Sequence, residues 1–200
     1  MWIMKFLKKI IPFWGGGGGN IGHRLYDRKH PEIPENSIAA LREGLKYQIM
    51  EGFKYWEFDV VESTDQILFV FHDNTKRKGI KRLCPTAPKE LQKKPLYKLP
   101  SNVISELTLM HTTEKIPTLA ELFSEFSRQN ITKPIRIEIK KLLTKQGKED
   151  LVVMAREFRN STGYDVNFMM FKKKFNKVFK DDKEWFTNLL RENGFELDFI

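Results

Sequence analysis

Apolar and polar residues alternate along positions 55–60, in the stretch YWEFDV. Because successive side chains of a strand point to opposite faces, Glu57 and Asp59 would share one face while apolar residues fill the other. Carboxylates that are buried without a partner are costly. The pattern therefore predicts a strand whose acidic face meets a cation, a metal ion or open water.

A second apolar run, at residues 67–71, follows after a gap too short for the crossover that a parallel neighbour needs. We therefore expect a hairpin in which the numbers of facing residues sum to about 130. That register places His72 beside Phe58 and Asp59. One short stretch would then bring two hard oxygen ligands and an imidazole to one place.

The residues before this hairpin indicate a strand and a helix that lead into it. A short strand is expected at 20–24, and a polar loop with prolines separates it from a helix that Asn36 or Ser37 can cap. Gly52 lies where a helix-terminating glycine belongs. The expected buried stripe of this helix is Ile38, Leu41, Leu45 and Ile49. This order of elements is the βαβ unit of a parallel α/β fold.

The rest of the chain alternates strands and helices after an interruption. Residues 74–116 show no sustained period, so we expect an inserted loop region packed over one end of the sheet. A capping box at Thr118–Glu121 begins the next helix. In the strand at 135–140, Glu138 and Lys140 share the face opposite the isoleucines, either in a site or as an internal ion pair. The elements expected after it are a helix near 150–160, a strand at 165–171, a helix at 182–192 and a strand at 195–200.

Composition narrows the class of protein. Two hundred residues, of which 40% are hydrophobic, suit one globular domain at 20–200 behind an N-terminal segment at 1–19. The single cysteine, Cys84, excludes an internal disulfide and cysteine-rich zinc sites, so we expect a cytoplasmic location. A net charge of +9 favours anionic partners. Nucleic acid is not an expected partner, because no recognised binding motif accompanies the charge.

Two basic and apolar stretches bear on membrane contact. Residues 1–14 make a poor signal peptide and fit either a membrane-surface anchor or a frayed terminus, which a glycine linker follows. In residues 171–180, aromatic side chains recur at helical spacing among lysines. A core-facing helix with a solvated basic face is the favoured interpretation, and peripheral membrane association is the alternative.

Six short motifs occur along the chain in the order of one enzyme family. They are Gly22-His23-Arg24, Pro34-Glu35-Asn36-Ser37, Glu57-x-Asp59-Val60, His72-Asp73, Pro117-Thr118-Leu119-x-Glu121 and Ile137-Glu138-Ile139-Lys140. As an ordered set they resemble the glycerophosphodiester phosphodiesterase family. The resemblance implies a TIM-type (β/α) barrel, a divalent metal ion, and hydrolysis of glycerophosphodiesters to glycerol 3-phosphate and an alcohol.

Carried over residue by residue, the resemblance implies a metal site and a phosphate site. Glu57, Asp59 and Glu138 would bind the metal, Mg²⁺ or Ca²⁺, for which carboxylates are suitable hard ligands. Arg24 and Lys140 would hold the phosphate of the substrate, a role for fixed positive charge.

The resemblance also implies that His23 and His72 are the acid and base. Imidazole suits both roles, because its unperturbed pKa of about 6.5 lies near working pH. One histidine would help the substrate's own glycerol hydroxyl attack phosphorus, and the other would protonate the departing alcohol. A cyclic phosphate would form and then be hydrolysed, with the order of the two histidines left open.

The chain also departs from the family pattern. Leu25 stands where the family usually has glycine, and lysines and an arginine follow Asp73 at 76–78. Only about five barrel strands are expected, whereas a TIM barrel has eight. The expectation is therefore an incomplete barrel, a barrel that closes by association into an oligomer, or a divergent relative with a smaller sheet. A catalytically inactive remnant, which binds phosphodiesters, lipid headgroups or a protein partner, is the alternative function.

Overall fold

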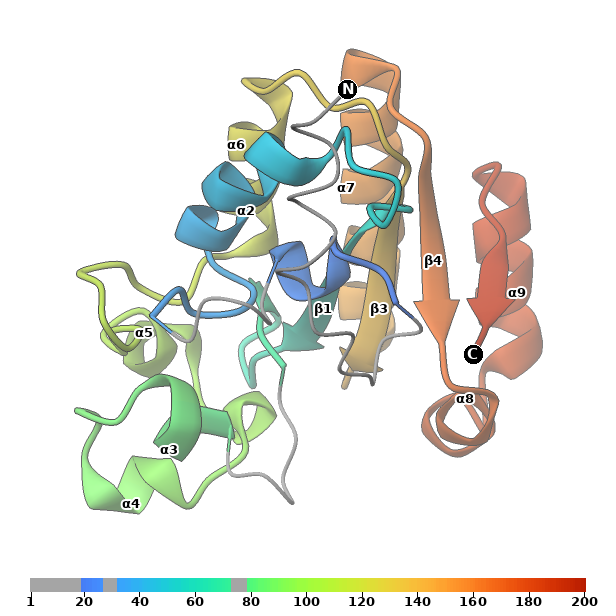
Figure 1. Ribbon diagram of the computed structural model, residues 1–200. Helices are drawn as coiled ribbons and strands as arrows, with labels where there is room; N and C mark the ends of the chain where they lie inside the picture. The colour runs from blue at the N-terminus through green and yellow to red at the C-terminus, as the bar shows by residue number, and fades with distance from the viewer. Residues whose placement is uncertain (1–18, 27–31, 73–78) are drawn as a thin grey trace, which may run out of the picture.

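The computed structural model describes residues 19–26, 32–72 and 79–200 (Figure 1). The segment expected at 1–19 lies outside these residues except for Gly19. The helical elements are η1 (His23–Leu25), α2 (Ile38–Gly44), η2 (Leu45–Tyr47), α3 (Gly79–Leu83), α4 (Lys89–Gln92), η4 (Leu96–Lys98), α5 (Ser101–Ile104), α6 (Leu119–Ser127), α7 (Lys145–Thr162), α8 (Lys172–Val178) and α9 (Lys183–Glu192). The strands are β1 (Trp56–Glu62), β2 (Leu68–Val70), β3 (Ile135–Lys141), β4 (Val166–Met170) and β5 (Leu197–Phe199).

The strands form one five-stranded sheet in the order β2-β1-β3-β4-β5. Strands β1, β3, β4 and β5 run parallel, whereas β2 pairs antiparallel with β1. Within the described residues the sheet does not close, since β2 and β5 each have a neighbour on one side only. Parallel strands joined by helices confirm the expected (β/α) barrel type, and the open sheet agrees with an incomplete barrel.

The pairing of β1 with β2 confirms the predicted hairpin. The Cα partners are Val60 with Val70, Val61 with Phe69 and Glu62 with Leu68. This is the predicted register. The amide of Phe71 donates to the carbonyl oxygen of Asp59 at 2.9 Å. His72 therefore follows β2 at the height of the two acidic residues of β1.

Residues 20–24 do not form the strand that the pattern predicted. They make a turn followed by η1, in which Arg24 has a φ of +50°. The segment still lies along β1, because the amide of Glu57 donates to Gly22 O at 2.9 Å, and a Cβ on Gly22 would lie 2.2 Å from Tyr55 O. The left-handed backbone after Gly22 turns the chain away from β1, so regular strand pairing cannot continue.

Helix α2 is shorter than predicted. Ser37 caps it, accepting a hydrogen bond from the amide of Ala40 at 2.9 Å. The α-helix ends at Gly44 and continues as η2, so Gly52 is not its cap. Because a 3₁₀ turn has fewer residues than an α turn, the later residues leave the predicted stripe. Ile49 was wrongly placed in that stripe and is 84% exposed.

Short helices occupy the region predicted as an inserted loop. Elements α3, α4, η4 and α5 surround a second apolar core that includes Ile80, Cys84 and Leu96. Figure 1 shows α3, α4 and α5 together beside one end of the sheet. Prolines stand at the N-caps of α4, η4 and α5, so no helix runs long enough to show a period in the sequence. Residues 73–78, where the predicted insertion begins, lie outside the described residues.

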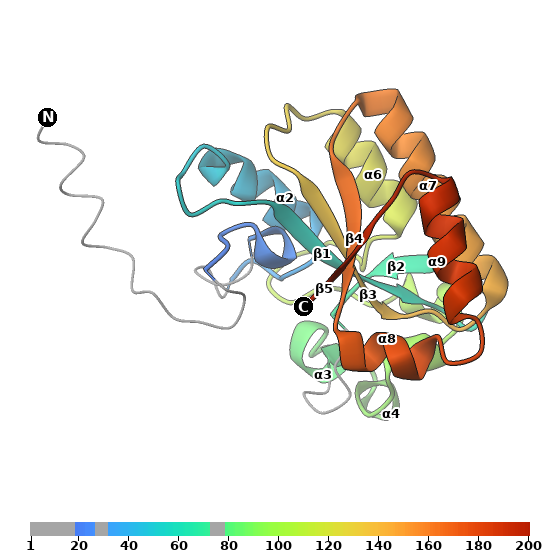
Figure 2. The same cartoon turned by 90° about the vertical axis from the view of Figure 1, so that its right-hand side faces the viewer.

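Helices α2, α6, α7 and α9 cover the apolar face of the sheet (Figure 2). This main core includes Trp56, Phe58 and Val60 of β1, which are fully buried. Since side chains alternate along a strand, Glu57 and Asp59 point to the face away from these helices. The predicted division of β1 into an apolar and an acidic face is therefore confirmed by its packing.

The later elements follow the predicted order. Helix α6 begins with the predicted capping box of Thr118 and Glu121, whereas α7 begins at Lys145, earlier than predicted, because Thr144 caps it. In α8, Phe175 is buried and the lysines are exposed, as the core-facing interpretation requires. No helix in the described part of the chain is long and apolar enough to cross a membrane.

Candidate active site

Three buried carboxylates form a cluster on the acidic face of the sheet. Glu57 and Asp59 lie on β1, and Glu138 of β3 is the direct partner of Asp59 in the parallel register. One ligand oxygen from each lies within 4.8 Å of the other two. Glu57 Oε1 has no hydrogen-bond partner among the described residues. A buried oxygen without a donor, beside two further carboxylates, fits one hard divalent cation.

The pKa values within this cluster shift in opposite directions. Burial, followed by the charges of Asp59 and Glu138, raises the pKa of Glu57 well above its usual value. Burial acts the same way on Asp59, but the ammonium of Lys140 and further nearby positive charge outweigh it and lower the pKa of Asp59. The negative charge of Glu57 is therefore less compensated than that of Asp59.

Lys140 bridges two of the carboxylates. Its ammonium lies 2.8 Å from Asp59 Oδ1 and forms a second ion pair with Glu138. Burial would lower the pKa of Lys140, but the charges of Asp59 and Glu138 outweigh burial and raise it. The internal ion pair considered from the sequence is therefore present, and it lies inside the carboxylate cluster.

Asn36 holds Asp59 from the loop before α2. Its Nδ2 donates to Asp59 Oδ2 at 2.7 Å, and its Oδ1 accepts the amide of Asp59 at 3.1 Å. Asn36 has a φ of +59°, a backbone region that asparagine tolerates better than most residues. From the sequence, Asn36 was expected only as a helix cap, and the signal for its second role was its place within the Pro-Glu-Asn-Ser motif.

The turn at η1 brings His23 and Arg24 to the carboxylates. The amide of Arg24 donates to Glu57 Oε2 at 2.8 Å, and His23 Nε2 lies 3.7 Å from the same oxygen. The guanidinium of Arg24 reaches towards Asp59, with Nε 3.6 Å from Oδ2. Its Nη2 lies 3.3 Å from Nε2 of His72. One buried arginine therefore joins η1 to the carboxylates and to the histidine after β2.

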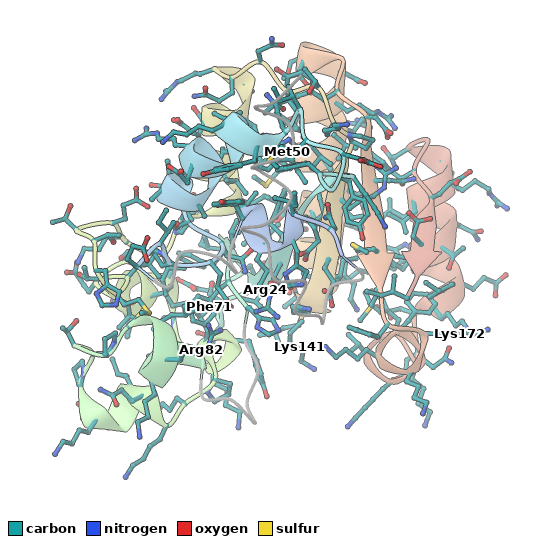
Figure 3. All side chains as sticks on the ribbon, in the orientation of Figure 1. Arg24, Met50, Phe71, Arg82, Lys141 and Lys172 are labelled. Atoms are coloured by element: carbon teal, nitrogen blue, oxygen red, sulfur yellow. The ribbon has the colours of Figure 1, made fainter. Side chains whose placement is uncertain are left out.

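Glu35 connects the second histidine to two arginines. Its Oε2 accepts from Arg24 Nη1 at 2.8 Å and from Arg82 Nη1 at 2.9 Å, and its Oε1 lies 3.4 Å from His72 Nδ1. Burial would raise the pKa of Glu35, but hydrogen bonds with His72 and Arg82 and the charges of both arginines hold it well below its usual range. Figure 3 shows Arg24, Arg82 and Lys141 gathered towards the same end of the molecule.

These contacts bring all seven residues expected from the sequence into one connected network. They are His23, Arg24, Glu57, Asp59, His72, Glu138 and Lys140. Glu35 and Arg82 also join the network, although neither was expected there from the sequence. Glu35 lies in a quoted motif, whereas Arg82 comes from α3 in the inserted region, where no periodic pattern marks it.

Comparison with known proteins identifies the family. Residues 23–187 match the model of the glycerophosphoryl diester phosphodiesterase family, which is more than half of the chain. The chain belongs to this family. The match spans the whole network, from His23 to Lys140, and continues through α8 into α9.

The curated relatives of this phosphodiesterase-family chain are much longer proteins. Over 109 residues it is 33% identical to a glycerophosphocholine phosphodiesterase of Rattus norvegicus, a span that covers 54% of the chain and 16% of the relative. The corresponding protein of Mus musculus gives the same identity over the same length and is covered to 15%. The matched part of the chain therefore covers less than a fifth of the length of each relative.

Solved structures of the family share the fold. A glycerophosphodiester phosphodiesterase from Parabacteroides distasonis aligns with a TM-score of 0.57 and 19% identity, covering 88% of this chain and 63% of that one. A phosphodiesterase from Oleispira antarctica, in complex with the product sn-glycerol-3-phosphate, gives a TM-score of 0.55 and 20% identity, covering 84% and 60%. These likenesses support the incomplete barrel.

Two further features lie outside the network of this family member. The exposed ring of Phe171, just after β4, has the ammonium of Lys140 at 5.9 Å from its centroid. A surface cleft of about 800 Å³ opens elsewhere, between Ile38, Phe69 and Thr118, and contains none of the seven residues. The cleft and the seven-residue network are therefore separate features of the molecule.

Proposed function

We propose that this chain hydrolyses glycerophosphodiesters to sn-glycerol 3-phosphate and an alcohol. One observation carries the proposal: two histidines, an arginine and a lysine contact the same three-carboxylate cluster directly or through one residue. Phosphoryl transfer needs positive charge at the phosphate and groups that move protons. Membership of the family supports this reaction class.

Glu57, Asp59 and Glu138 would hold one divalent cation, Mg²⁺ or Ca²⁺. When bound, such an ion supplies positive charge that polarises a phosphate oxygen. Oε1 of Glu57 is buried without a hydrogen-bond partner among the described residues, so it is the oxygen that the ion would stabilise most. Asn36 would orient Asp59 as a ligand, since outer hydrogen bonds to a ligating carboxylate fix its direction.

Arg24 and Lys140 would hold the phosphate of the substrate. Arg24 is buried and already reaches Asp59 through Nε and His72 through Nη2. Lys140 pairs with Asp59 and Glu138, so its ammonium lies at the edge of the metal site. Two fixed cations beside the carboxylates would place the phosphate across the cluster.

His23 and His72 would move the protons. One imidazole accepts the proton of a glycerol hydroxyl as its oxygen bonds to phosphorus, and the other donates a proton to the alcohol oxygen as its bond to phosphorus breaks. The cyclic phosphate then opens when water adds and the two histidines exchange roles. Glu35 holds the Nδ1 side of His72, which would keep Nε2 facing the site.

The test is release of sn-glycerol 3-phosphate from glycerophosphocholine, glycerophosphoethanolamine and glycerophosphoinositol, with Mg²⁺ or Ca²⁺ and with a chelator. We expect turnover that the chelator abolishes and that His23→Asn lowers at least a hundredfold. His111→Asn is the matched control, because His111 is exposed and outside the network. Absence of turnover in a sample with native circular dichroism would overturn the proposal and favour a non-catalytic binding role.

A further inference from the structure

The side of the network next to β4 ends in an aromatic ring flanked by two lysines. Phe171 is the N-cap of α8 and is 44% exposed. The Nζ atom of Lys140 lies 5.9 Å from the ring centroid, and that of Lys174 lies 5.2 Å from it. The ring therefore lies near one cation of the network, Lys140, and one cation of α8, Lys174.

Lys174 is electrostatically part of the same region. Partial burial of its ammonium, followed by the charge of Lys140, lowers the pKa of Lys174, while the charges of Glu138 and Asp59 act in the opposite direction. Among the described residues Lys174 forms no ion pair, unlike Lys140. Its charge is therefore available to a ligand that reaches the Phe171 side of the carboxylates.

The two sides of the network differ in the groups that they could receive. On the His72 side, Arg24 and Glu35 form a buried and fully polar cluster, which suits the small hydroxyl-bearing glycerol common to all substrates. On the other side, Phe171 is exposed and the lysines of α8 reach solvent. An open side tolerates groups of different size, and the alcohol is the part that varies among glycerophosphodiesters.

We propose that Lys174 is a specificity-determining residue, which favours glycerophosphodiesters with an anionic alcohol and disfavours those whose alcohol is a quaternary ammonium. The inference rests on the proposed function and adds the substrate class. An exposed aromatic face usually attracts a quaternary ammonium. Here two ammonium groups already lie within 6 Å of the ring centroid, so a third cation is repelled while an anion gains a partner.

The kinetic test compares kcat/KM for glycerophosphoinositol 4-phosphate, glycerophosphoinositol and glycerophosphocholine, all followed by release of sn-glycerol 3-phosphate. We expect the wild-type protein to prefer them in that order. Lys174→Glu should lower the ratio of the first substrate to the third about tenfold, because reversing one charge changes both Coulomb interactions. Lys174→Met, which keeps the chain length and removes the charge, should lower it by about half as much on a logarithmic scale.

Lys177→Glu is the matched control. It makes the same charge change one turn further along α8, at a lysine that is not one of the two beside the Phe171 ring. The ratio should stay within about twofold of wild type in this variant. An unchanged ratio in Lys174→Glu, an equal change in Lys177→Glu, or an equal change of kcat/KM for all three substrates would overturn the inference. The last result would place the common part of the substrate beside Lys174.

A binding measurement separates this inference from the proposed function. Calorimetric titration of the His23→Asn protein with glycerophosphoinositol 4-phosphate and with glycerophosphocholine gives two Kd values without turnover. We expect the anionic ligand to bind more tightly and Lys174→Glu, combined with His23→Asn, to reduce the difference about tenfold. Selective binding without turnover of any substrate would uphold the inference and overturn the proposed function. Equal Kd values, or binding of neither ligand, would overturn the inference itself.

Discussion

The side chain of Glu62 fills the space beside Gly147, so that a Cβ on this glycine would lie 2.3 Å from the carboxylate carbon. Glu62 ends β1 and accepts the amide of Thr144 at 3.0 Å together with the amide of Leu143. The carboxylate thus joins the C-terminal end of the strand to the first turn of α7. Gly147 is the residue that allows the helix to approach so closely.

Gly147→Ala should therefore destabilise the protein. In an exposed helix the same substitution stabilises by about 1 kcal/mol, because alanine is the better helix former. Here the new methyl group would displace Glu62, and we expect the free energy of unfolding to fall by about 1–3 kcal/mol. Urea denaturation measures this, with Asn160→Ala as the control on the exposed face of α7. A Gly147→Ala protein as stable as wild type would contradict the contact.

The ion pairs of Glu35 predict a pH-dependent stability. The folded-state pKa of Glu35 lies below its ordinary value of 4.5, so the unfolded chain binds more protons as the pH falls below that value. The contribution of Glu35 is therefore fully present above about pH 5 and decreases towards lower pH. We expect Glu35→Gln to cost about 1–3 kcal/mol at pH 7. The difference from wild type should shrink as the pH falls below 4.5.

Urea denaturation between pH 3 and pH 8 checks the Glu35 prediction. Glu106→Gln is the control, since Glu106 is exposed and its side chain lies outside the network. The control should follow the wild-type curve at every pH. A cost of Glu35→Gln that stays constant down to pH 3 would show that folding does not lower the pKa of Glu35.

The strand pairing could be predicted from the sequence because hydrophobic alternation and a short turn determine it together. The apolar residues of β1 must face the helices, so a register slip of one residue would bury Glu57 and Asp59 in the main core. The order of α6, β3 and α7 follows from the same periodicity. The seven residues expected in the site came instead from the ordered motifs that resemble the family, and four of them, Glu57, Asp59, Glu138 and Lys140, lie on β1 and β3.

The rest of the structure depends on tertiary contacts that have no periodic signature. Residues 20–24 read as a strand, yet the close approach of Gly22 to Tyr55 and the left-handed backbone at Arg24 make them a turn. Arg82 enters the site from a five-residue helix in the proline-rich insertion. Lys174 belongs to a basic stripe that the sequence indicates as a solvated helix face, and only the three-dimensional position of Phe171 connects it to the site.

Asn36 should affect the concentration of metal ion that turnover requires, because it holds Asp59 in place. Asn36→Gly keeps a backbone that tolerates a φ of +59° but removes both hydrogen bonds to Asp59. We expect the Mg²⁺ concentration for half-maximal turnover to rise ten- to a hundredfold, as is typical when a ligand loses its outer hydrogen bonds. His111→Gly is the matched control, since His111 also has a left-handed backbone, with a φ of +60°, but lies outside the site. An unchanged Mg²⁺ dependence would rule out an orienting role.

Glu57→Gln should separate folding stability from metal binding. In the metal-free protein the charges of Asp59 and Glu138 disfavour ionised Glu57, whose pKa is raised first of all by burial. A neutral amide removes that repulsion and can still accept the amide of Arg24, so the metal-free Tm should stay the same or rise.

Wild-type protein at a metal concentration of a hundred times Kd should gain about 2.7 kcal/mol, or roughly 5–10 °C in Tm for a chain of this length. Glu57→Gln should lose most of this gain, because one of the three carboxylates proposed to bind the ion is gone. Differential scanning calorimetry with Mg²⁺, Ca²⁺ and chelator measures both effects, and Glu90→Gln, an exposed substitution in α4, should retain the full metal-dependent rise. A Glu57→Gln protein that keeps the rise would place the cation elsewhere.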